Sequence, residues 1–263
     1  MWAQFWHDRL KRPFKLHYEV YGNGPVTVLL LHGIASSGSF WQPLIDELDH
    51  SRFTLIVPDL LGHGASPRPP YLTYSTADQA VSVLALLKRL KVRHCLVVGH
   101  SMGCLVASRL TAMAPARVER LLLYEPPLFA DLPEFKSHAR RRKFYLDLYA
   151  RIAANPAGRL TMTRLVARIS KKWTAFLASD QTWLPIERSL RNAIIAQESF
   201  EELKDIAVQT DIVHGRLDVI VPKAQLKDML SSNPNISFFR TTDRHGLSRR
   251  SARYLARLIS EPA

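Results

Sequence analysis

The chain has few cysteines, no apolar run of membrane-spanning length, and no repeated or low-complexity tract. Its two cysteines, Cys95 and Cys104, are too few for a disulfide framework or a four-thiolate zinc site, and both lie in apolar stretches, which predicts reduced core thiols. Charged residues interrupt the first twelve positions before an apolar segment of signal-peptide length develops. These absences argue against a disulfide-rich secreted domain and a transmembrane protein, and they predict a cytoplasmic location.

The composition is that of a folded globular protein with a basic excess. Hydrophobic residues make up 47% of the 263 residues and charged residues 22%, which argues against a disordered chain or a coiled coil. The net charge is +13, of which residues 17–130 contribute only +1, whereas 131–204 contribute +6 and 240–263 contribute +4. Because no zinc-finger spacing or aromatic RNA-binding signature accompanies this charge, we expect no nucleic-acid partner and at most weak association with anionic surfaces. No feature of the sequence sets the oligomeric state.

Apolar strand-like runs alternate with amphipathic, helix-like segments along most of the chain. Runs without alternation are typical of parallel strands that are covered on both faces, and they occur at residues 26–31, 53–57, 95–98, 121–124, 212–214 and 236–240. A further strand at 15–21, followed by the turn residues 22–25, predicts a hairpin with the run at 26–31. The alternation of strand and helix predicts an α/β fold with a mostly parallel sheet.

Strand signals stop between residues 131 and 204, where helix-like pieces take over, and they resume after residue 205. The segments on both sides of this stretch must therefore complete one sheet. We predict a core formed by residues 1–130 and 205–263, and an inserted helical cap at 131–204.

A candidate nucleophile stands in the sequence Gly99-His100-Ser101-Met102-Gly103. This G-x-S-x-G pattern follows the strand-like run at 95–98 and opens a helix, which is the context that a nucleophile elbow requires. Glycines on both sides relieve crowding, and the start of a helix favours developing negative charge. A chance match at this junction is the less favoured interpretation, so we predict that Ser101 is the nucleophile.

Groups that would stabilise an oxyanion follow the run at 26–31, in His32-Gly33-Ile34. A loop amide at this position can face the serine and act together with the amide after the nucleophile. The predicted donors are therefore the backbone N–H groups of Ile34 and Met102. We expect His32 to orient the loop by hydrogen bonding rather than to act as a base.

A nucleophilic serine needs a general base, and the base needs an acid that fixes its tautomer. His245 follows the last predicted strand, and Asp218 follows the strand before it. Both loops would lie at the carboxyl edge of a parallel sheet, beside Ser101. The chain order Ser101, Asp218, His245 is the order expected on this architecture, whereas Asp243 is too close in sequence to His245 to orient it.

The chain resembles the α/β-hydrolase superfamily over nearly its whole length. The resemblance rests on His32-Gly33, Pro58 to Ser66, Gly99 to Gly103, His214 to Asp218 and His245-Gly246. It implies a mostly parallel sheet of about eight strands flanked by helices, with a helical cap inserted after the sixth strand and the chemistry of a serine esterase. It also implies that Asp59 and His63 brace a loop near the site rather than take part in catalysis.

Three residues refine what the resemblance implies. Dehalogenases and epoxide hydrolases of the superfamily carry an aspartate where Ser101 stands. Members that cleave carbon–carbon bonds often have an aromatic residue directly after the histidine, whereas this chain has Gly246. Glu125 is a second candidate acid because some members carry their acid at that position, although we favour a pocket-lining role for it.

We predict a serine hydrolase that cleaves a carboxylic ester of a small to medium acyl substrate through an acyl-enzyme, without metal or cofactor. Two alternatives stay open: carbon–carbon hydrolysis of a diketone-like acid in the same fold, and a non-catalytic basic binding module for an anionic membrane or nucleic acid. Aromatic side chains of the cap are expected to roof a pocket over the serine. The candidate substrate-binding residues are Gly33, His100, Glu125, Tyr145, Trp173 and Trp183.

Overall fold

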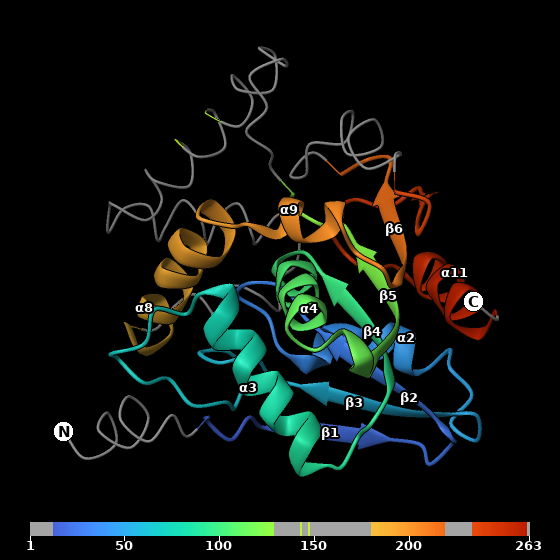
Figure 1. The fold of residues 1–263 in the computed structure, drawn as a ribbon, viewed down its shortest axis with the longest axis horizontal. Helices are drawn as coiled ribbons and strands as arrows, with labels where there is room; N and C mark the ends of the chain where they lie inside the picture. The colour runs from blue at the N-terminus through green and yellow to red at the C-terminus, as the bar shows by residue number, and fades with distance from the viewer. Residues whose placement is uncertain (1–12, 129–142, 144–146, 148–179, 219–232, 262–263) are drawn as a thin grey trace.

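A seven-stranded sheet runs through the described part of the chain (Figure 1). The computed structural model describes residues 13–128, 143, 147, 180–218 and 233–261. The strand order is β1-β3-β2-β4-β5-β6-β7, and every neighbouring pair is parallel except β1 with β3. The strands are β1 (Tyr18–Tyr21), β2 (Val26–Leu31), β3 (Phe53–Pro58), β4 (Cys95–His100), β5 (Val118–Tyr124), β6 (Gln209–Gly215) and β7 (Ile236–Thr241). The predicted α/β fold is confirmed.

The predicted hairpin between β1 and β2 is wrong. Strand β1 pairs antiparallel with β3 instead, with Tyr18 opposite Pro58. The turn after β1 is bound to the start of β3, since the N–H of Gly24 donates to the carbonyl of Phe53. Burial agrees with this arrangement: β2, whose side chains are buried from Val28 onward, lies inside the sheet between β3 and β4, whereas β1 is half-exposed and suits an edge.

Helices cover both faces of the sheet and form three layers (Figure 1). The longer helices are α3 (Thr76–Arg89), α4 (Met102–Met113) and α11 (Arg249–Ser260), and the shorter segments are η1 (Gly38–Trp41), α2 (Gln42–Ile45), η2 (Pro115–Arg117), α8 (Asp180–Ser189), the π-helix η3 (Leu190–Ile195) and α9 (Ser199–Lys204). Alternate residues of β2 face opposite layers: Leu29 packs with α3 and α4, and Leu30 packs with α2 and α11. Burial on both faces accounts for the unbroken apolar runs in the strands.

The segment predicted as a cap follows β5, which is the fifth strand along the described chain. The resemblance implied about eight strands with the cap after the sixth, whereas the described residues hold seven strands. The described part of 131–204 includes α8, η3 and α9, whose buried side chains Ile186, Leu190 and Phe200 join the apolar cluster of α3 and α4. Most of this segment lies outside the described residues, so the predicted domain boundaries stay a prediction.

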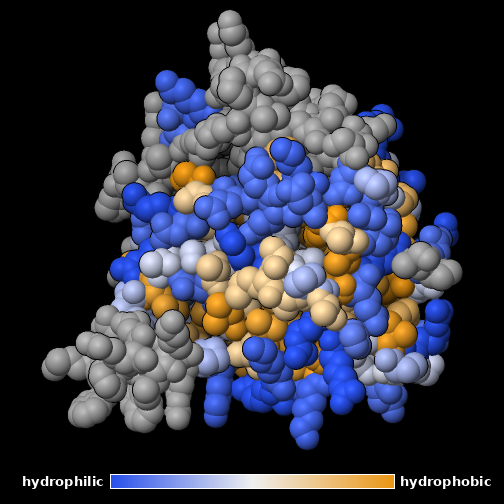
Figure 2. Space-filling view, viewed as in Figure 1, coloured by the Kyte–Doolittle hydropathy of each residue, from blue (hydrophilic) through white to orange (hydrophobic). Residues whose placement is uncertain are grey.

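The face that carries α3 and α4 has both apolar and hydrophilic side chains. Apolar side chains gather across its middle, and hydrophilic side chains line its lower edge (Figure 2). Both cysteines are free and buried, as predicted. Among the described helices, none combines the length and hydrophobicity that crossing a bilayer demands.

Candidate active site

Ser101 occupies a strained turn between β4 and α4. Its backbone has φ 51° and ψ −121°, a region that non-glycine residues rarely adopt and that typically costs about 1–3 kcal/mol. The flanking glycines are required by close packing: a Cβ on Gly99 would lie 2.6 Å from the carbonyl oxygen of Gly103, and one on Gly103 would lie 2.2 Å from that of Leu31. Only glycine at both positions lets α4 start this close to the strands, which places Ser101 at the carboxyl edge of the sheet.

The structure brings the three predicted catalytic residues together from three separate loops. The Nε2 atom of His245 lies 2.9 Å from the Oγ of Ser101, and its Nδ1 lies 2.8 Å from the Oδ2 of Asp218. All three residues are less than a tenth exposed. Because a carboxylate only accepts, Nδ1–H donates to Asp218, and Nε2 is left to accept the hydroxyl proton of Ser101.

Backbone hydrogen bonds hold the turn that carries Asp218. The N–H of Arg216 donates to Thr241 at 2.9 Å, and the N–H of Leu217 donates to Asp243 at 3.1 Å. The N–H of Asp218 itself donates to Gly215 at 3.2 Å. The first two bonds join the turn after β6 to the end of β7 and the loop that follows it, and the third closes the turn, so the acid is fixed relative to the loop of the histidine.

The loop after β2 lies against the nucleophile. A Cβ on Gly33 would be 3.1 Å from the Cβ of Ser101, so the loop passes directly beside the serine. His32 braces this loop: its Nε2 accepts from the N–H of Leu60 at 3.0 Å, and Nδ1–H donates to the carbonyl of Gly33 at 2.7 Å. Burial lowers the pKa of His32, which agrees with this neutral, orienting form.

The two predicted oxyanion donors come from different segments: Met102 is the next residue after Ser101, and Ile34 belongs to the loop that passes beside the serine at Gly33. Met102 follows the serine and is the first residue of α4, and Ile34 follows Gly33 and packs, half-buried, against the apolar cluster of α3 and α4. The helix start adds a partial positive charge at this point. The arrangement suits an oxygen that becomes negative during reaction, and the roles of both residues stay a prediction.

Four of the remaining predicted pocket residues differ in their places in the structure. His100 is buried, stacks on Phe40 at 4.1 Å between ring centroids, and lies 5.0 Å from the His245 ring. Burial, followed by the neighbouring His245, holds the pKa of His100 well below its usual range, so His100 is a neutral group. Trp183 lies on α8 and packs against the apolar cluster of α3 and α4. Tyr145 and Trp173 lie outside the described residues.

The loop of Asp59 and His63 has the bracing contacts that the resemblance implied. The carboxylate of Asp59 accepts from the N–H groups of Gly38 at 2.7 Å and Ala65 at 2.8 Å. His63 is buried and hydrogen-bonds the carbonyl of Leu61 through Nδ1 at 2.9 Å. Burial and the nearby His32 lower the pKa of His63 to about 3, so it carries no charge at neutral pH.

Tyr124 is a supporting residue that the sequence analysis missed. Its hydroxyl donates to the carbonyl of Gly246 at 2.7 Å, directly after His245, and burial raises its pKa above the usual range. Asp243 accepts from the N–H and the hydroxyl of Ser248 at 2.9 and 2.8 Å, so it caps the loop into α11 and does not orient His245. The sequence does show a tyrosine at the end of a strand, but it does not indicate the hydrogen-bond partner, Gly246, which lies 122 positions away.

The buried acids of the site form a compact group with the histidine. A carboxylate oxygen of Glu125, one of Asp218 and a nitrogen of His245 lie within 4.8 Å of one another, a grouping that could hold a metal ion. Both acids already accept hydrogen bonds. Oδ2 of Asp218 accepts from His245, and Oε1 of Glu125 accepts from the N–H of Gly215 at 2.5 Å. This hydrogen bonding fits an acid–base relay, and the predicted independence from metal stays a prediction.

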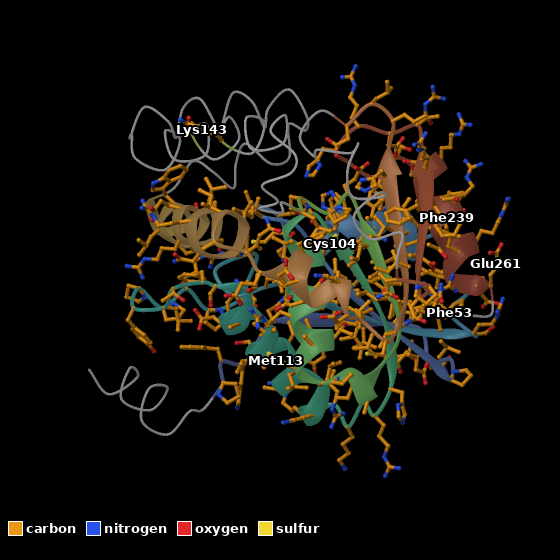
Figure 3. All side chains as sticks on the ribbon, turned by 45° about the horizontal axis from the view of Figure 1, so that its top comes forward. Phe53, Cys104, Met113, Lys143, Phe239 and Glu261 are labelled. Atoms are coloured by element: carbon orange, nitrogen blue, oxygen red, sulfur yellow. The ribbon has the colours of Figure 1, made fainter. Side chains whose placement is uncertain are left out.

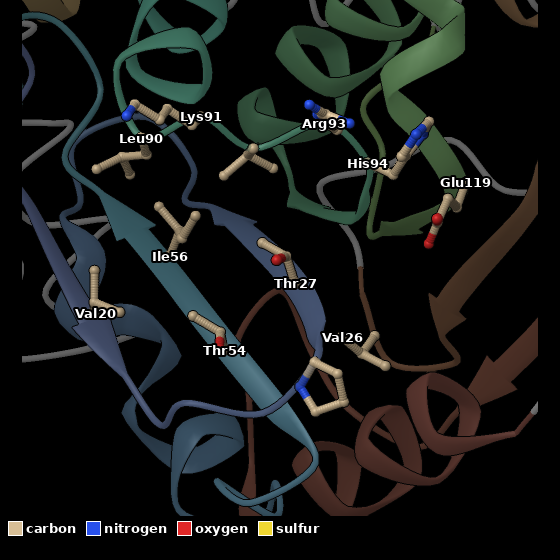
Figure 4. Close-up of a pocket in the computed structure, with 12 residues that line it drawn as sticks. Val20, Val26, Thr27, Thr54, Ile56, Leu90, Lys91, Arg93, His94 and Glu119 are labelled. Carbon is tan, nitrogen blue, oxygen red and sulfur yellow. The ribbon is translucent and has the colours of Figure 1, made fainter.

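A cavity of about 640 Å³ lies at the opposite edge of the sheet (Figure 4). Its lining includes Val26 and Thr54, at the starts of β2 and β3, and Lys91 and Arg93 after α3. Ser101, Asp218 and His245 instead follow the carboxyl ends of strands. This cavity is therefore separate from the candidate active site.

Comparison with known proteins places the chain in a family. The family model for the alpha/beta hydrolase fold matches residues 26–243. A pimeloyl-[acyl-carrier protein] methyl ester esterase of Nitrosomonas europaea is 30% identical over 219 residues, which cover 79% of this chain and 82% of that protein. Lipase LipV of Mycobacterium tuberculosis is 40% identical over 118 residues, or 44% of this chain and 43% of the lipase. Several other curated relatives are matched over only 31% to 41% of their length.

Solved structures agree in fold. An esterase from Exiguobacterium antarcticum superposes with a TM-score of 0.77 at 17% identity, covering 94% of this chain and 96% of that one. An enol-lactonase from Burkholderia xenovorans gives a TM-score of 0.73 at 20% identity, covering 93% of this chain and 94% of the lactonase. The resemblance read from the sequence is confirmed: the chain belongs to the alpha/beta hydrolase fold family.

Proposed function

We propose that the protein is a serine hydrolase that cleaves a carboxylic ester of a small to medium acyl substrate through an acyl-enzyme. The observation that carries the proposal is the continuous hydrogen-bonded relay from Asp218 through His245 to the Oγ of Ser101. An esterase and a lipase among the relatives support the same class of reaction.

In the acylation step, the Oγ of Ser101 attacks the ester carbonyl while Nε2 of His245 takes its proton. The negative oxygen of the tetrahedral intermediate accepts hydrogen bonds from the N–H groups of Ile34 and Met102. Asp218 stabilises the imidazolium, which then gives its proton to the leaving alcohol. Water, activated by His245, releases the acid and restores Ser101.

Burial strengthens each of these interactions. Ser101, Asp218 and His245 are all nearly inaccessible, so the charges that develop between them are screened less than they would be in water. The N-terminal end of α4 points its partial positive charge at the same place. The site is thus organised for charge that appears only during reaction, which is the condition for rate acceleration.

A panel of p-nitrophenyl esters from two to sixteen acyl carbons tests the substrate class. Each methylene that enters a closed pocket is expected to raise kcat/KM by up to about fourfold, equivalent to ~0.8 kcal/mol, until the pocket is full. We therefore expect activity to peak at short or middle chain lengths and to fall for long chains. Equal activity at all lengths, or a continued rise to long-chain emulsions, would contradict a closed acyl pocket.

The same panel separates the alternative functions. Cleavage of a dienol-type carbon–carbon substrate without ester turnover would establish carbon–carbon hydrolysis, despite Gly246 after His245. A folded protein that neither turns over esters nor reacts with a fluorophosphonate probe would support the binding-module alternative. Ser101→Ala, measured in parallel, gives the background for every substrate.

A further inference from the structure

Glu125 is a fully buried acid for which the reaction steps above have no use. It follows β5 directly and adopts a positive φ of 54°, and its N–H donates to the carbonyl of Val213 at 2.9 Å. Its side chain reaches across to β6, where Oε1 accepts from the N–H of Gly215 at 2.5 Å. A Cβ on Gly215 would lie 2.3 Å from this oxygen, so the contact requires glycine there.

Gly215 is the first residue of the turn that carries Asp218. Its N–H is held by Glu125, and its carbonyl accepts from the N–H of Asp218 at 3.2 Å. One residue, Gly215, therefore links the buried Glu125, bonded to its N–H, with the backbone of Asp218, bonded to its carbonyl. On its other side, Glu125 faces His214, whose Nδ1 lies 3.8 Å from Oε2.

We propose that Glu125 is a positioning residue that holds the turn Gly215–Asp218, so that the Asp218 carboxylate reaches His245. The proposal rests on the proposed function, and it replaces the pocket-lining role predicted from the sequence. The essential property is a hydrogen-bond acceptor at Oε1, since a second negative charge within 4.8 Å of Asp218 is unfavourable in a buried site. Glutamine supplies the same acceptor without the charge.

A double-mutant cycle on ester hydrolysis tests this role. We expect Glu125→Ala to lower kcat by about 10- to 100-fold with KM changed less than about threefold, and Glu125→Gln to restore most of the loss. In an Asp218→Ala background, adding Glu125→Ala should cost less than about twofold, because the turn then has no acid to position. Thr210→Ala, which removes a buried hydroxyl at the far end of β6, is the matched control and should show equal effects in both backgrounds.

Each other outcome overturns the proposal. An equal loss of kcat from Glu125→Ala in both backgrounds would indicate a general effect on folding. A larger loss of kcat in the Asp218→Ala background would indicate that Glu125 replaces Asp218 as the acid when Asp218 is absent. Glutamine as damaging as alanine would show that the charge is required. Circular dichroism and thermal midpoints identify variants that fail to fold. The rate of fluorophosphonate labelling of wild type tests the proposed function separately, since its failure leaves no labelling at all.

An independent observation concerns the exposed side of α11. The buried side of this helix carries Ala252, Leu255, Leu258 and Ile259, and the opposite side carries only arginine among its charged residues before Glu261. We call this set the arginine face: Arg249, Arg250, Arg253 and Arg257. At 100° per residue these four side chains occupy a stripe about 100° wide. In Figure 3, nitrogen-tipped side chains project outward around this helix.

The arginine face is largely unpaired within the described residues. Only Arg253 has an acidic partner there, Glu47 at 3.4 Å, whereas Arg249, Arg250 and Arg257 have none. Arg249 and Arg250 are also the first two residues of α11, where the helix dipole disfavours cations. Arg249 and Arg250 therefore reduce the stability of the helix, whereas Arg257, in its last turn, suits the dipole.

The arginine face continues to the edge of the candidate active site. Asp243 connects the two: its carboxylate accepts from the N–H of Ser248, which caps α11, and its carbonyl accepts from the N–H of Leu217, in the turn of Asp218. Leu217 is 59% exposed, the most exposed of the large apolar residues described. Arg216 and Arg244 are exposed beside it.

We infer that the arginine face, with Leu217 at its end, docks the protein on an anionic lipid bilayer. Positive charge beside an exposed apolar side chain suits lipid headgroups above a hydrocarbon layer. Nucleic acid fits less well, because its single strands bind aromatic platforms and the aromatic residue of α11, Tyr254, packs half-buried against the core.

Sedimentation with vesicles tests the inference. Wild type should bind phosphatidylcholine vesicles that contain 30% phosphatidylserine, and it should lose binding as salt is raised. The triple variant Arg249→Gln/Arg250→Gln/Arg257→Gln should bind on the order of 100-fold more weakly, since each basic residue near the surface contributes about fivefold. The charge-matched control is Lys88→Gln/Lys91→Gln/Arg93→Gln, whose exposed side chains lie near the start of the sheet. It should retain binding.

Three results would overturn the inference. The first is an equal loss of vesicle binding in the two triple variants, because binding would then depend only on net charge. The others are absence of wild-type binding to anionic vesicles, and tighter binding to a polynucleotide than to the vesicles at equal salt. Thermal midpoints of both variants establish that they are folded. The vesicle measurement needs no catalytic turnover, so it stands apart from the proposed function.

Discussion

Ser101→Ala is expected to abolish ester hydrolysis, with a fall in kcat on the order of 10⁶, the scale seen when the nucleophile of a serine triad is removed. The expectation follows from the geometry of one atom, because the Oγ of Ser101 is the only part of the relay that attacks the substrate, and His245 cannot replace it from 2.9 Å away. A hydroxyl-free side chain leaves the oxyanion donors in place, so a small residual rate is expected.

Steady-state kinetics and covalent labelling check this prediction together. A fluorophosphonate probe should label wild type at Ser101 and leave Ser101→Ala unlabelled. Ser108→Ala is the matched control, since Ser108 is also buried on α4 but donates to the carbonyl of Cys104 away from the relay. Labelling that persists in Ser101→Ala, or turnover within about tenfold of wild type (~1.4 kcal/mol), would contradict the assignment.

The position of Ser101 could be predicted because its determinants are local. Gly99 and Gly103 stand where a Cβ would collide with backbone, and the strand before them and the helix after them have clear periodic signals. The places of Asp218 and His245 followed from chain order, since loops after parallel strands meet at one edge of the sheet. Local patterns and topology together therefore indicated the relay.

The partner of β1 could not be predicted from the sequence. The turn residues at 22–25 are equally compatible with a hairpin, in which β1 pairs with β2, and with a connection that passes β3 and leaves β1 paired with β3. The choice depends on the place of β2 between the parallel strands β3 and β4, which is a property of the whole sheet. The contact of Glu125 with Gly215 likewise depends on the register of β5 and β6, where Tyr124 lies opposite Val213. Glu125 and Gly215 are 90 positions apart, and no local sequence pattern at either residue predicts their contact.

Asp218→Asn is expected to be far more damaging than Glu125→Gln, although both substitutions remove one buried negative charge. An asparagine amide at position 218 can donate to Nδ1 of His245, which would move the ring proton to Nε2, the atom that must accept from Ser101. Loss of the correct tautomer in a triad lowers kcat on the order of 10⁴. Glutamine at position 125 keeps an oxygen for the N–H of Gly215, so its loss should stay within about tenfold.

The ranking of these two variants decides which acid serves His245. It is measured as kcat/KM on the best ester of the chain-length panel, with circular dichroism as the check that both variants are folded. A folded Glu125→Gln that is slower than Asp218→Asn would move the acid to the end of β5, where Glu125 lies. The 2.8 Å contact of Asp218 with Nδ1 predicts the opposite order, because only a group bonded directly to the ring can fix its tautomer and stabilise its positive charge.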